Sequence, residues 1–305
     1  MNLKEKIQAE KTKAFFKKVW RFIVEKKIGS ILVWAFIIGI NVFYISTIIK
    51  NDNQNSQIAT EDTEQTIAEN CNVLAVEVAG TITSNGINGS DELFSSDGDT
   101  SYSDDIKSQL DSAKTDDDIK AVLLTVNSYG GDAGSAQEIV YALKNLDKPV
   151  VAVIRSVGAS AGYWIASVAD KVYAYETADV GSIGVTMSHL DETALNSKDG
   201  KVFVSLSSGK FKDMGNPDKP LTAEEKTLMM RDINDIYDIF IKQVAESRKM
   251  SVDKVKQIAD GSSMVAGRAK EKGLIDEIGS TYDAIEYLAT IIEEKPEVCE
   301  LSYEE

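Results

Sequence analysis

The sequence predicts an α/β fold built around a parallel sheet, and three observations support this. Residues 121–127 (AVLLTVN) and 149–154 (PVVAVI) are continuous apolar runs, the pattern of strands covered on both faces. Between them, residues 133–146 place apolar side chains at helical spacing. Because strands that alternate with helices favour parallel pairing, the order strand–helix–strand indicates a parallel sheet.

The other predicted elements extend this alternation. Residues 73–80 read as a first buried strand, 160–169 as a helix and 171–176 as a further strand. A long helix is predicted from about Thr222 to Met250, with Thr222 and Glu225 forming a capping box at its start. Residues 84–104, rich in Ser, Asn, Gly and Asp, are predicted to form a long exposed loop.

The N-terminal region predicts a membrane anchor. Residues 28–49 contain no charged side chain, and a stretch of about 20 apolar residues suffices to cross a bilayer. Residues 1–27 carry nine basic and three acidic residues, which predicts a cytoplasmic N-terminus. We therefore expect a single-pass protein of the cell membrane with an extracytoplasmic globular domain. The predicted parts are a basic arm (1–27), a transmembrane helix (28–49), a linker (50–72), the folded domain (73–290) and an acidic tail (291–305). The tail is predicted to be disordered, with contact to a neighbouring subunit as the alternative.

Charge and cysteine content narrow the function classes. Residues 51–305 carry 23 basic and 46 acidic side chains, so the domain repels nucleic acid. Cys71 and Cys299 form no CxxC pair, which argues against zinc and thioredoxin-like sites. Two free thiols are the favoured reading, and a disulfide between them is the alternative.

A candidate nucleophile lies at the junction of a predicted strand and helix. Gly158-Ala159-Ser160-Ala161-Gly162 fits the pattern G-x-S-x-G, which can expose a serine at a sharp turn. The N-terminus of a helix offers free N–H groups to a developing oxyanion. Small residues that merely allow close strand-to-helix packing would give the same string.

A second glycine-rich segment ends the preceding strand, at 127–131 (NSYGG). Paired glycines let backbone N–H groups face a ligand without a Cβ in the way. The N–H of Gly130 or Gly131, together with that of Ala161, could form an oxyanion hole. An ordinary strand-to-helix turn is the alternative.

The general base is predicted to be a lysine, because the chain contains one histidine. His189 follows Ser160 by 29 residues and reads as a surface residue rather than as part of a Ser-His-Asp triad. A neutral lysine can activate serine instead, provided that burial lowers its pKa by about 2 to 4 units. Lys210 and Lys212 are the candidates, and solvated surface lysines are the alternative reading for both.

Several strings, in order, resemble the signal peptide peptidase A (SppA) family in its short, single-domain form. They are NSYGGDAGSAQEI, KPVVAVIRSVGASAGYWIASVADKVYA, GSIGV, SGKFKDMGNPDKPLTAEE and GRAKEKGLIDEIG. The resemblance covers roughly residues 73–285 and the N-terminal anchor. It implies a ClpP/crotonase-like α/β fold and a serine protease of the Ser-Lys type.

The resemblance also assigns roles by position. Ser160 falls on the nucleophile, Lys212 on the general base, and Ser182 on a serine that helps to hold the lysine. Gly130 and Ala161 fall on the oxyanion region. Two departures stand out, since Tyr129 replaces the family's proline and Ala161 its glycine, which leads us to expect an altered pocket with activity retained.

Partners and alternatives follow from the same resemblance. It implies homo-oligomeric rings or domes on the membrane, neighbouring subunits that share the dyad, and cleaved signal peptides or other extended hydrophobic chains as substrates. No metal or other cofactor is implied. The alternatives are an inactive scaffold of the same fold that binds membrane proteins or peptides, and a crotonase-like acyl-CoA enzyme.

Overall fold

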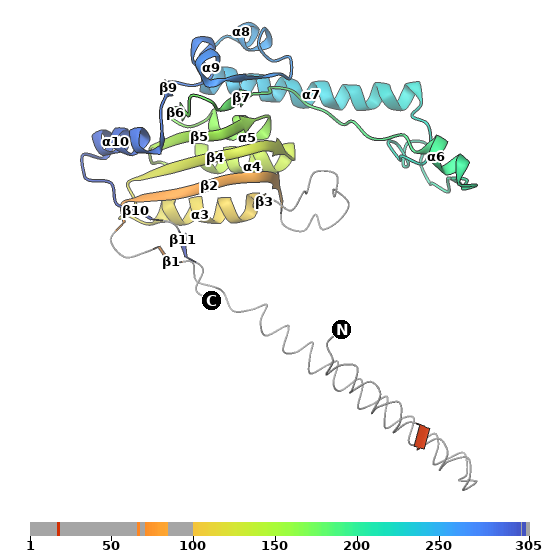
Figure 1. Cartoon of the computed structure of the whole chain (residues 1–305), viewed down its shortest axis with the longest axis horizontal. Coiled ribbons are helices and arrows are strands. Elements are labelled where there is room, and N and C mark those ends of the chain that lie inside the picture. The colour runs from red at the N-terminus through yellow and green to blue at the C-terminus, as the bar shows by residue number, and fades with distance from the viewer. Residues whose placement is uncertain (1–16, 19–65, 68–70, 85–99, 300, 303–305) are drawn as a thin grey trace. The chain divides into compact units, whose positions relative to one another are not determined.

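The computed structural model (Figure 1) describes residues 17–18, 66–67, 71–84, 100–299 and 301–302. The predicted anchor at 28–49 and almost all of the predicted basic arm lie outside the described residues. Within the described ranges, no helix combines the length and the apolar character that crossing a bilayer requires. The described residues from 66 to 302 belong to one compact unit.

The sheet of this unit is mainly parallel, as predicted. Its central order is β10-β2-β4-β5-β6-β9, and each of these neighbours pairs in parallel. Short strands complete its margins: β3 pairs with the end of β2, and β7 lies between β5 and the antiparallel β8. The strand bounds are β2 Val73–Thr83, β3 Thr100–Tyr102, β4 Ala121–Gly131, β5 Val150–Ala159, β6 Lys171–Ala174, β7 Asp179–Gly181, β8 Ser263–Val265, β9 Glu277–Ile278 and β10 Val298–Cys299.

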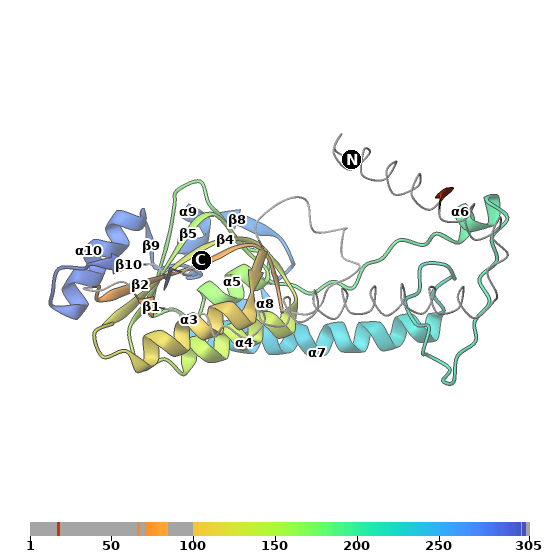
Figure 2. The same ribbon diagram turned by 90° about the horizontal axis from the view of Figure 1, so that it is seen from below.

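Helices cover both faces of the sheet (Figure 2). The larger core lies between the sheet and helices α3, α4 and α5, where side chains such as Leu124 and Ile154 are fully buried. A smaller core on the other face holds α10 through Ala284 and Leu288. The helix bounds are α3 Ser103–Thr115, α4 Ala133–Lys144, α5 Ala161–Ala166, α6 Thr193–Lys198, α7 Ala223–Ser247, α8 Val252–Lys256, α9 Ala266–Lys272 and α10 Thr281–Ile292.

The long helix begins where the sequence predicts it. Thr222 is the N-cap of α7, and its side chain and that of Glu225 form the reciprocal capping box. The predicted loop at 84–104 is wrong at its C-terminal end, because residues 100–102 form β3 and α3 begins at Ser103. The helix α3 was missed because only Ser103, Ile106, Leu110 and Ala113 are buried in an otherwise polar segment.

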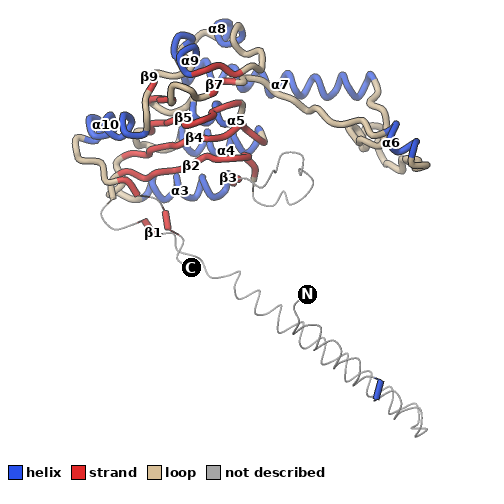
Figure 3. Tube along the Cα trace, in the orientation of Figure 1, coloured by secondary structure: helices blue, strands red, loops and turns tan. Residues whose placement is uncertain are grey.

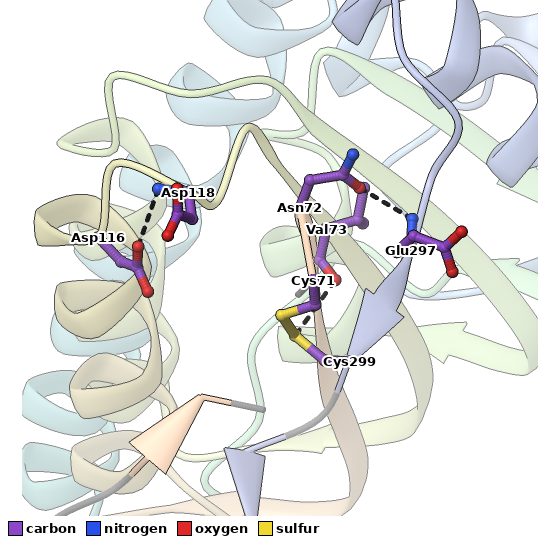
Figure 4. Close-up of a disulfide and its surroundings, with 7 residues drawn as sticks. All are labelled: Cys71, Asn72, Val73, Asp116, Asp118, Glu297 and Cys299. Carbon is purple, nitrogen blue, oxygen red and sulfur yellow. Dashed lines mark hydrogen bonds between the residues drawn. A yellow bond between two sulfur atoms is a disulfide. The ribbon is translucent and has the colours of Figure 1, made fainter. Parts of the chain in front are cut away.

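A disulfide corrects the reading of the two cysteines as free thiols (Figure 4). Cys71 and Cys299 are bonded to each other across 228 residues of chain. Residues 298–299 are strand β10, which pairs with the start of β2, so the prediction of a disordered tail is wrong for this part. Beyond the disulfide, β1 (Thr66–Ile67) pairs with β11 (Leu301–Ser302). The two ends of the folded domain are thus fastened together at one edge of the sheet.

A long projection leaves the rest of the domain, and we call residues 185–236 the arm. It comprises α6, its flanking loops and the first half of α7 (Figure 3). Among these residues only Glu225 is buried. The remainder of the unit is called the body, and α7 enters it where the Tyr237 hydroxyl donates to the Ala259 carbonyl at 2.6 Å.

Candidate active site

Ser160 stands at the turn between β5 and α5, in a conformation that side-chain-bearing residues rarely adopt. Its φ is 52° and its ψ is −123°. Its N–H donates to the Gly181 carbonyl at 2.8 Å, and its own carbonyl accepts from the Trp164 N–H at 2.9 Å. Strain of this kind persists only where the surroundings enforce it, and it is the geometry expected of a serine nucleophile on a sharp strand-to-helix turn.

Gly130 approaches this serine more closely than any other residue type would allow. A Cβ on Gly130 would lie 2.9 Å from Cβ of Ser160, 3.2 Å from its Oγ and 3.1 Å from the Ala161 nitrogen. The φ of Gly130 is +116°, which also favours glycine. The two glycine-containing segments predicted from sequence therefore meet at one place, and the Ala161 N–H lies at the same junction.

Ser128, which sequence reasoning assigned no role, holds the glycine turn in place. It is fully buried, and its hydroxyl donates to the Gly80 carbonyl at 2.6 Å and accepts from the Gly130 N–H at 3.0 Å. The Gly130 N–H is therefore already used, and Gly131, which pairs with Ile82 of β2, is the remaining candidate donor on this side. A serine within an otherwise apolar buried strand was the signal that could have identified this role.

Ser182 lies next to Ser160 across the pairing of β5 with β7. Ala159 pairs with Gly181, so the residues that follow each strand end are neighbours. Ser182 has a φ of 50°, its N–H donates to the Ser262 carbonyl at 2.9 Å, and its hydroxyl donates to the Gly261 carbonyl at 3.0 Å. The structure thus brings Ser160, Ser182 and Gly130 together at the carboxyl ends of the strands.

Lys212 lies elsewhere, in the segment 199–222 of the arm, which runs to the start of α7. Two ion pairs tie this segment to the first turn of that helix, Lys210 to Glu224 and Lys219 to Glu225. In the body, α7 contacts α5 through Phe240, which stacks on Trp164 with ring centroids 4.6 Å apart. At 1.5 Å of rise per residue, the start of α7 lies about 25 Å from Phe240. Figures 1 and 2 agree that this end of α7 is far from α5.

The two candidate lysines differ in their surroundings. The ammonium of Lys210 contacts the Glu224 carboxylate and lies 5.1 Å from the centre of the Phe211 ring. Lys212 is exposed, and no hydrogen bond or ion pair of its side chain is found with the described residues. His189 is exposed on the arm.

Below the serine, α5 is held by buried polar contacts. The Tyr163 hydroxyl donates to the Leu274 carbonyl at 2.8 Å, and burial raises the pKa of this phenol. The Trp164 indole N–H donates to the Gln243 side chain on α7. No grouping of three or more His, Cys, Asp or Glu side chains that could bind a metal exists in the described ranges.

A second, largely buried contact also holds this part of the body together. The Arg248 guanidinium binds the Asp276 carboxylate through two hydrogen bonds, of 3.0 and 2.8 Å. Burial alone would raise the pKa of Asp276, but hydrogen bonds from Arg248 and from the Val172 N–H outweigh burial and lower it. The pair therefore joins the C-terminal end of α7 to the residue that precedes β9, and the Asp276 carboxylate also contacts β6 through the Val172 N–H.

The family is decided by sequence comparison. The model of peptidase family S49 matches residues 142–294, half of the chain. A protein of Enterococcus faecium described as a candidate signal peptide peptidase SppA is 34% identical over 248 residues, which cover 77% of this chain and 70% of the relative. The chain belongs to peptidase family S49. The predicted resemblance to the SppA family is confirmed.

Other comparisons find similarity to further proteases. A candidate protease of Methanocaldococcus jannaschii is 37% identical over 199 residues, 64% of each chain. The Clp protease family model matches residues 84–180, which supports the predicted ClpP-like α/β fold. A solved ClpP1 variant of Listeria monocytogenes aligns over 69% of this chain and 93% of its own, at 17% identity and a TM-score of 0.45.

Proposed function

We propose that this S49 chain is a serine endopeptidase in which Ser160 is the nucleophile and Lys212 of a neighbouring subunit is the general base. The observation that carries the proposal is the strained turn at Ser160, which faces Gly130 on one side and neighbours Ser182 on the other. A strained conformation at a site packed against glycine is expected where a hydroxyl must be presented to a substrate.

The chemistry is acyl transfer. Neutral Lys212 accepts the Ser160 proton while Oγ attacks the peptide carbonyl carbon, and the oxyanion is stabilised by the N–H groups of Ala161 and Gly131. The C–N bond then breaks, and the lysine returns its proton to the leaving amine. Water, activated by the same lysine, hydrolyses the acyl-enzyme. Ser182, beside the nucleophile, orients the incoming lysine.

The arm is the reason for assigning the base to a second subunit. Within one chain, the segment that carries Lys212 is anchored to the far end of α7, about 25 Å from the helix contact below Ser160. A neighbouring subunit could place its own arm over the serine. That contact would also bury the lysine, and burial favours the neutral form that a base needs.

We further propose that the domain is extracytoplasmic and held to the cell membrane by residues 28–49, and that its substrates are cleaved signal peptides and other extended hydrophobic chains. The apolar stretch and its basic flank support the anchor. The disulfide between Cys71 and Cys299 supports an oxidising compartment, because such bonds are rare in the cytosol.

The test is complementation between two inactive variants of the full chain. Ser160→Ala and Lys212→Ala should each abolish cleavage of a quenched fluorescent peptide with a signal-peptide apolar core. When the two variants are co-expressed, activity should return, because some interfaces join an intact serine to an intact lysine.

Lys210→Ala is the matched control, and it should remain active alone. If the co-expressed variants stay inactive while the wild type is active, the dyad lies within one chain and the assignment across subunits is wrong. If Ser160 of the wild type reacts with no serine-directed probe, the inactive scaffold is the better description.

A further inference from the structure

An exposed aliphatic row lies on the arm immediately before Lys212. Residues 201–207 form no helix or paired strand, and Val202, Val204 and Leu206 occupy every second position, which in an extended chain places them on one side. Val202, Val204 and Leu206 are 83%, 69% and 93% exposed, although each is aliphatic. We call these three side chains the aliphatic row.

The opposite side of this segment is fixed to the arm. The hydroxyls of Ser205 and Ser207 both donate to the carboxylate of Asp213, and these two bonds lower the pKa of Asp213. The carboxylate therefore remains charged at neutral pH and holds the two serines. Because successive side chains of an extended segment point to opposite sides, this contact turns the aliphatic row away from the arm. It also sets the row next to Lys212, the neighbour of Asp213 in the chain.

We expect an exposed row of this kind to be covered by a partner. An unpaired extended segment with an apolar face is a template for association, and soluble proteins normally cover it. The arm cannot cover it, since Glu225 is its only buried residue. The charge of the arm tip indicates what the partner is. Residues 196–221 contain five lysines and three aspartates, whereas the whole chain has a net charge of −16. A second copy of this chain offers the complementary acidic surface.

The receiving surface on that copy lies beside its serine. Tyr129 directly precedes Gly130, which contacts Ser160, and the Tyr129 side chain is 79% exposed. Tyr102, at the end of β3, is 39% exposed and lies at the same edge of the sheet, because β3 and β4 both pair with the last residues of β2. The exposed carboxylate of Asp104 follows at the start of α3. We call Tyr129, Tyr102 and Asp104 the Tyr129 rim. This rim combines aromatic and acidic groups, which suit an aliphatic row flanked by lysines.

We infer that the aliphatic row of one subunit docks on the Tyr129 rim of a second copy of the chain and thereby delivers Lys212 to that copy's serine. This inference rests on the proposed function, because it assumes that the lysine crosses between subunits. Any docking that brings Lys212 to Ser160 must also bring the row, which is fastened to Asp213, close to Tyr129. The tyrosine, at the position where the family has proline, is then an assembly contact.

Cross-linking between two separately tagged full-length chains tests the contact directly. One chain carries Val204→Cys and the other Tyr129→Cys, and the membranes that contain both are treated with a short bismaleimide. We expect a cross-linked product that carries both tags. Cys71 and Cys299 should not react, since they are joined in the disulfide. The control pair uses Tyr282→Cys, which is 81% exposed on α10, with Val204→Cys, and should give no product.

A second measurement separates failure of this inference from failure of the proposed function. Leu206→Ser should weaken subunit association at least 10-fold in sedimentation experiments, whereas Val252→Ser, on α8, should leave association unchanged. If the Tyr129 cross-link is absent while complementation of Ser160→Ala by Lys212→Ala succeeds, the subunits meet through another surface and the inference fails alone. If Leu206→Ser raises KM for the peptide without changing association, the row binds substrate and the inference is likewise overturned.

Discussion

The body and the arm are stabilised in opposite ways. In the body, strands β2, β4 and β5 bury nearly every apolar side chain between two layers of helices. In the arm, a stretch of more than fifty residues, only Glu225 is buried. Short turns and ion pairs hold the arm, and apart from the Lys219–Glu225 pair these ion pairs are exposed. Surface pairs each contribute little, about 0 to 1 kcal/mol. The proposed nucleophile therefore lies in the region with the buried core, and the proposed base in a region that buries almost no apolar surface within its own chain.

The strongest test of this contrast uses the same substitution in both regions. Arg248→Ala removes one partner of a largely buried pair in the body, where the guanidinium is 7% exposed, and leaves the Asp276 carboxylate with the Val172 N–H but without the guanidinium. We expect a loss of about 3 to 5 kcal/mol of unfolding free energy in urea titrations. Arg231→Ala breaks an exposed pair with Asp232 in the arm and should change stability by less than about 1 kcal/mol. Equal effects would contradict the contrast.

Loss of the disulfide should also act on the body alone. The double variant Cys71→Ser/Cys299→Ser removes a cross-link that spans 228 residues, and we expect a loss of about 2 to 4 kcal/mol. Hydrogen exchange should show faster exchange in β10 and at Val73 and Leu74, with no change in the arm. Reduction of the wild type should reproduce the effect, and an unchanged urea midpoint after complete reduction would disprove it.

Gly130→Ala should harm the reaction with little effect on the arm. The added Cβ would lie 2.9 Å from Cβ of Ser160 and would force the serine or its turn to move. We expect labelling of Ser160 by a serine-directed probe to slow about 100-fold, the size of effect produced by loss of one oxyanion donor. Gly267→Ala, where nothing lies within 4 Å of the new Cβ, is the control and should react normally.

The smallest effect concerns the one buried residue of the arm. A hydrogen bond from Lys219, followed by one from the Thr222 N–H, lowers the pKa of Glu225 to about 2 from its ordinary value of 4.5. Because the folded pKa is depressed, this stabilisation is complete above about pH 4.5 and is lost as the pH falls toward 2. Amide exchange of residues 222–228, corrected for its intrinsic pH dependence, should accelerate across this window. Glu225→Gln should show fast exchange already at neutral pH, and body amides should show neither change.

The sequence predicted those elements whose signals are local. The strands β4 and β5 appear as uninterrupted apolar runs because both of their faces are covered. The start of α7 could be predicted because Thr222 and Glu225 form a capping box. The helix α3 escaped notice because it buries one narrow stripe, Ile106, Leu110 and Ala113, in a polar segment. Strands of two or three residues, such as β7 and β10, carry no periodic signal and depend on tertiary pairing.

In the candidate site, too, the features with a local sequence signal could be predicted, and those that depend on tertiary contacts could not. The sequence placed Ser160 and Gly130 in two separate glycine-containing segments, and the structure brings these segments together. The close approach of Gly130 to Ser160 explains why glycine stands there, while the catalytic roles stay predictions. The part played by Ser128 depends on the carbonyl of Gly80, a residue 48 positions away that only the folded sheet brings near. The base was narrowed to Lys212 by family resemblance, and the relation between that lysine and the serine stays a prediction.

The pairing of β10 with β2, and the disulfide beside it, can form only after almost the whole chain has been synthesised. Cys71 emerges early, yet its partner follows only after 228 further residues. At 5 to 20 residues per second, the ribosome takes about 10 to 45 s to supply it. During that interval the outer edge of β2 lacks its C-terminal neighbour, and the thiol of Cys71 is open to wrong partners. A thiol-disulfide isomerase, or a chaperone that binds the incomplete chain, should therefore raise the yield of protein with the Cys71–Cys299 disulfide.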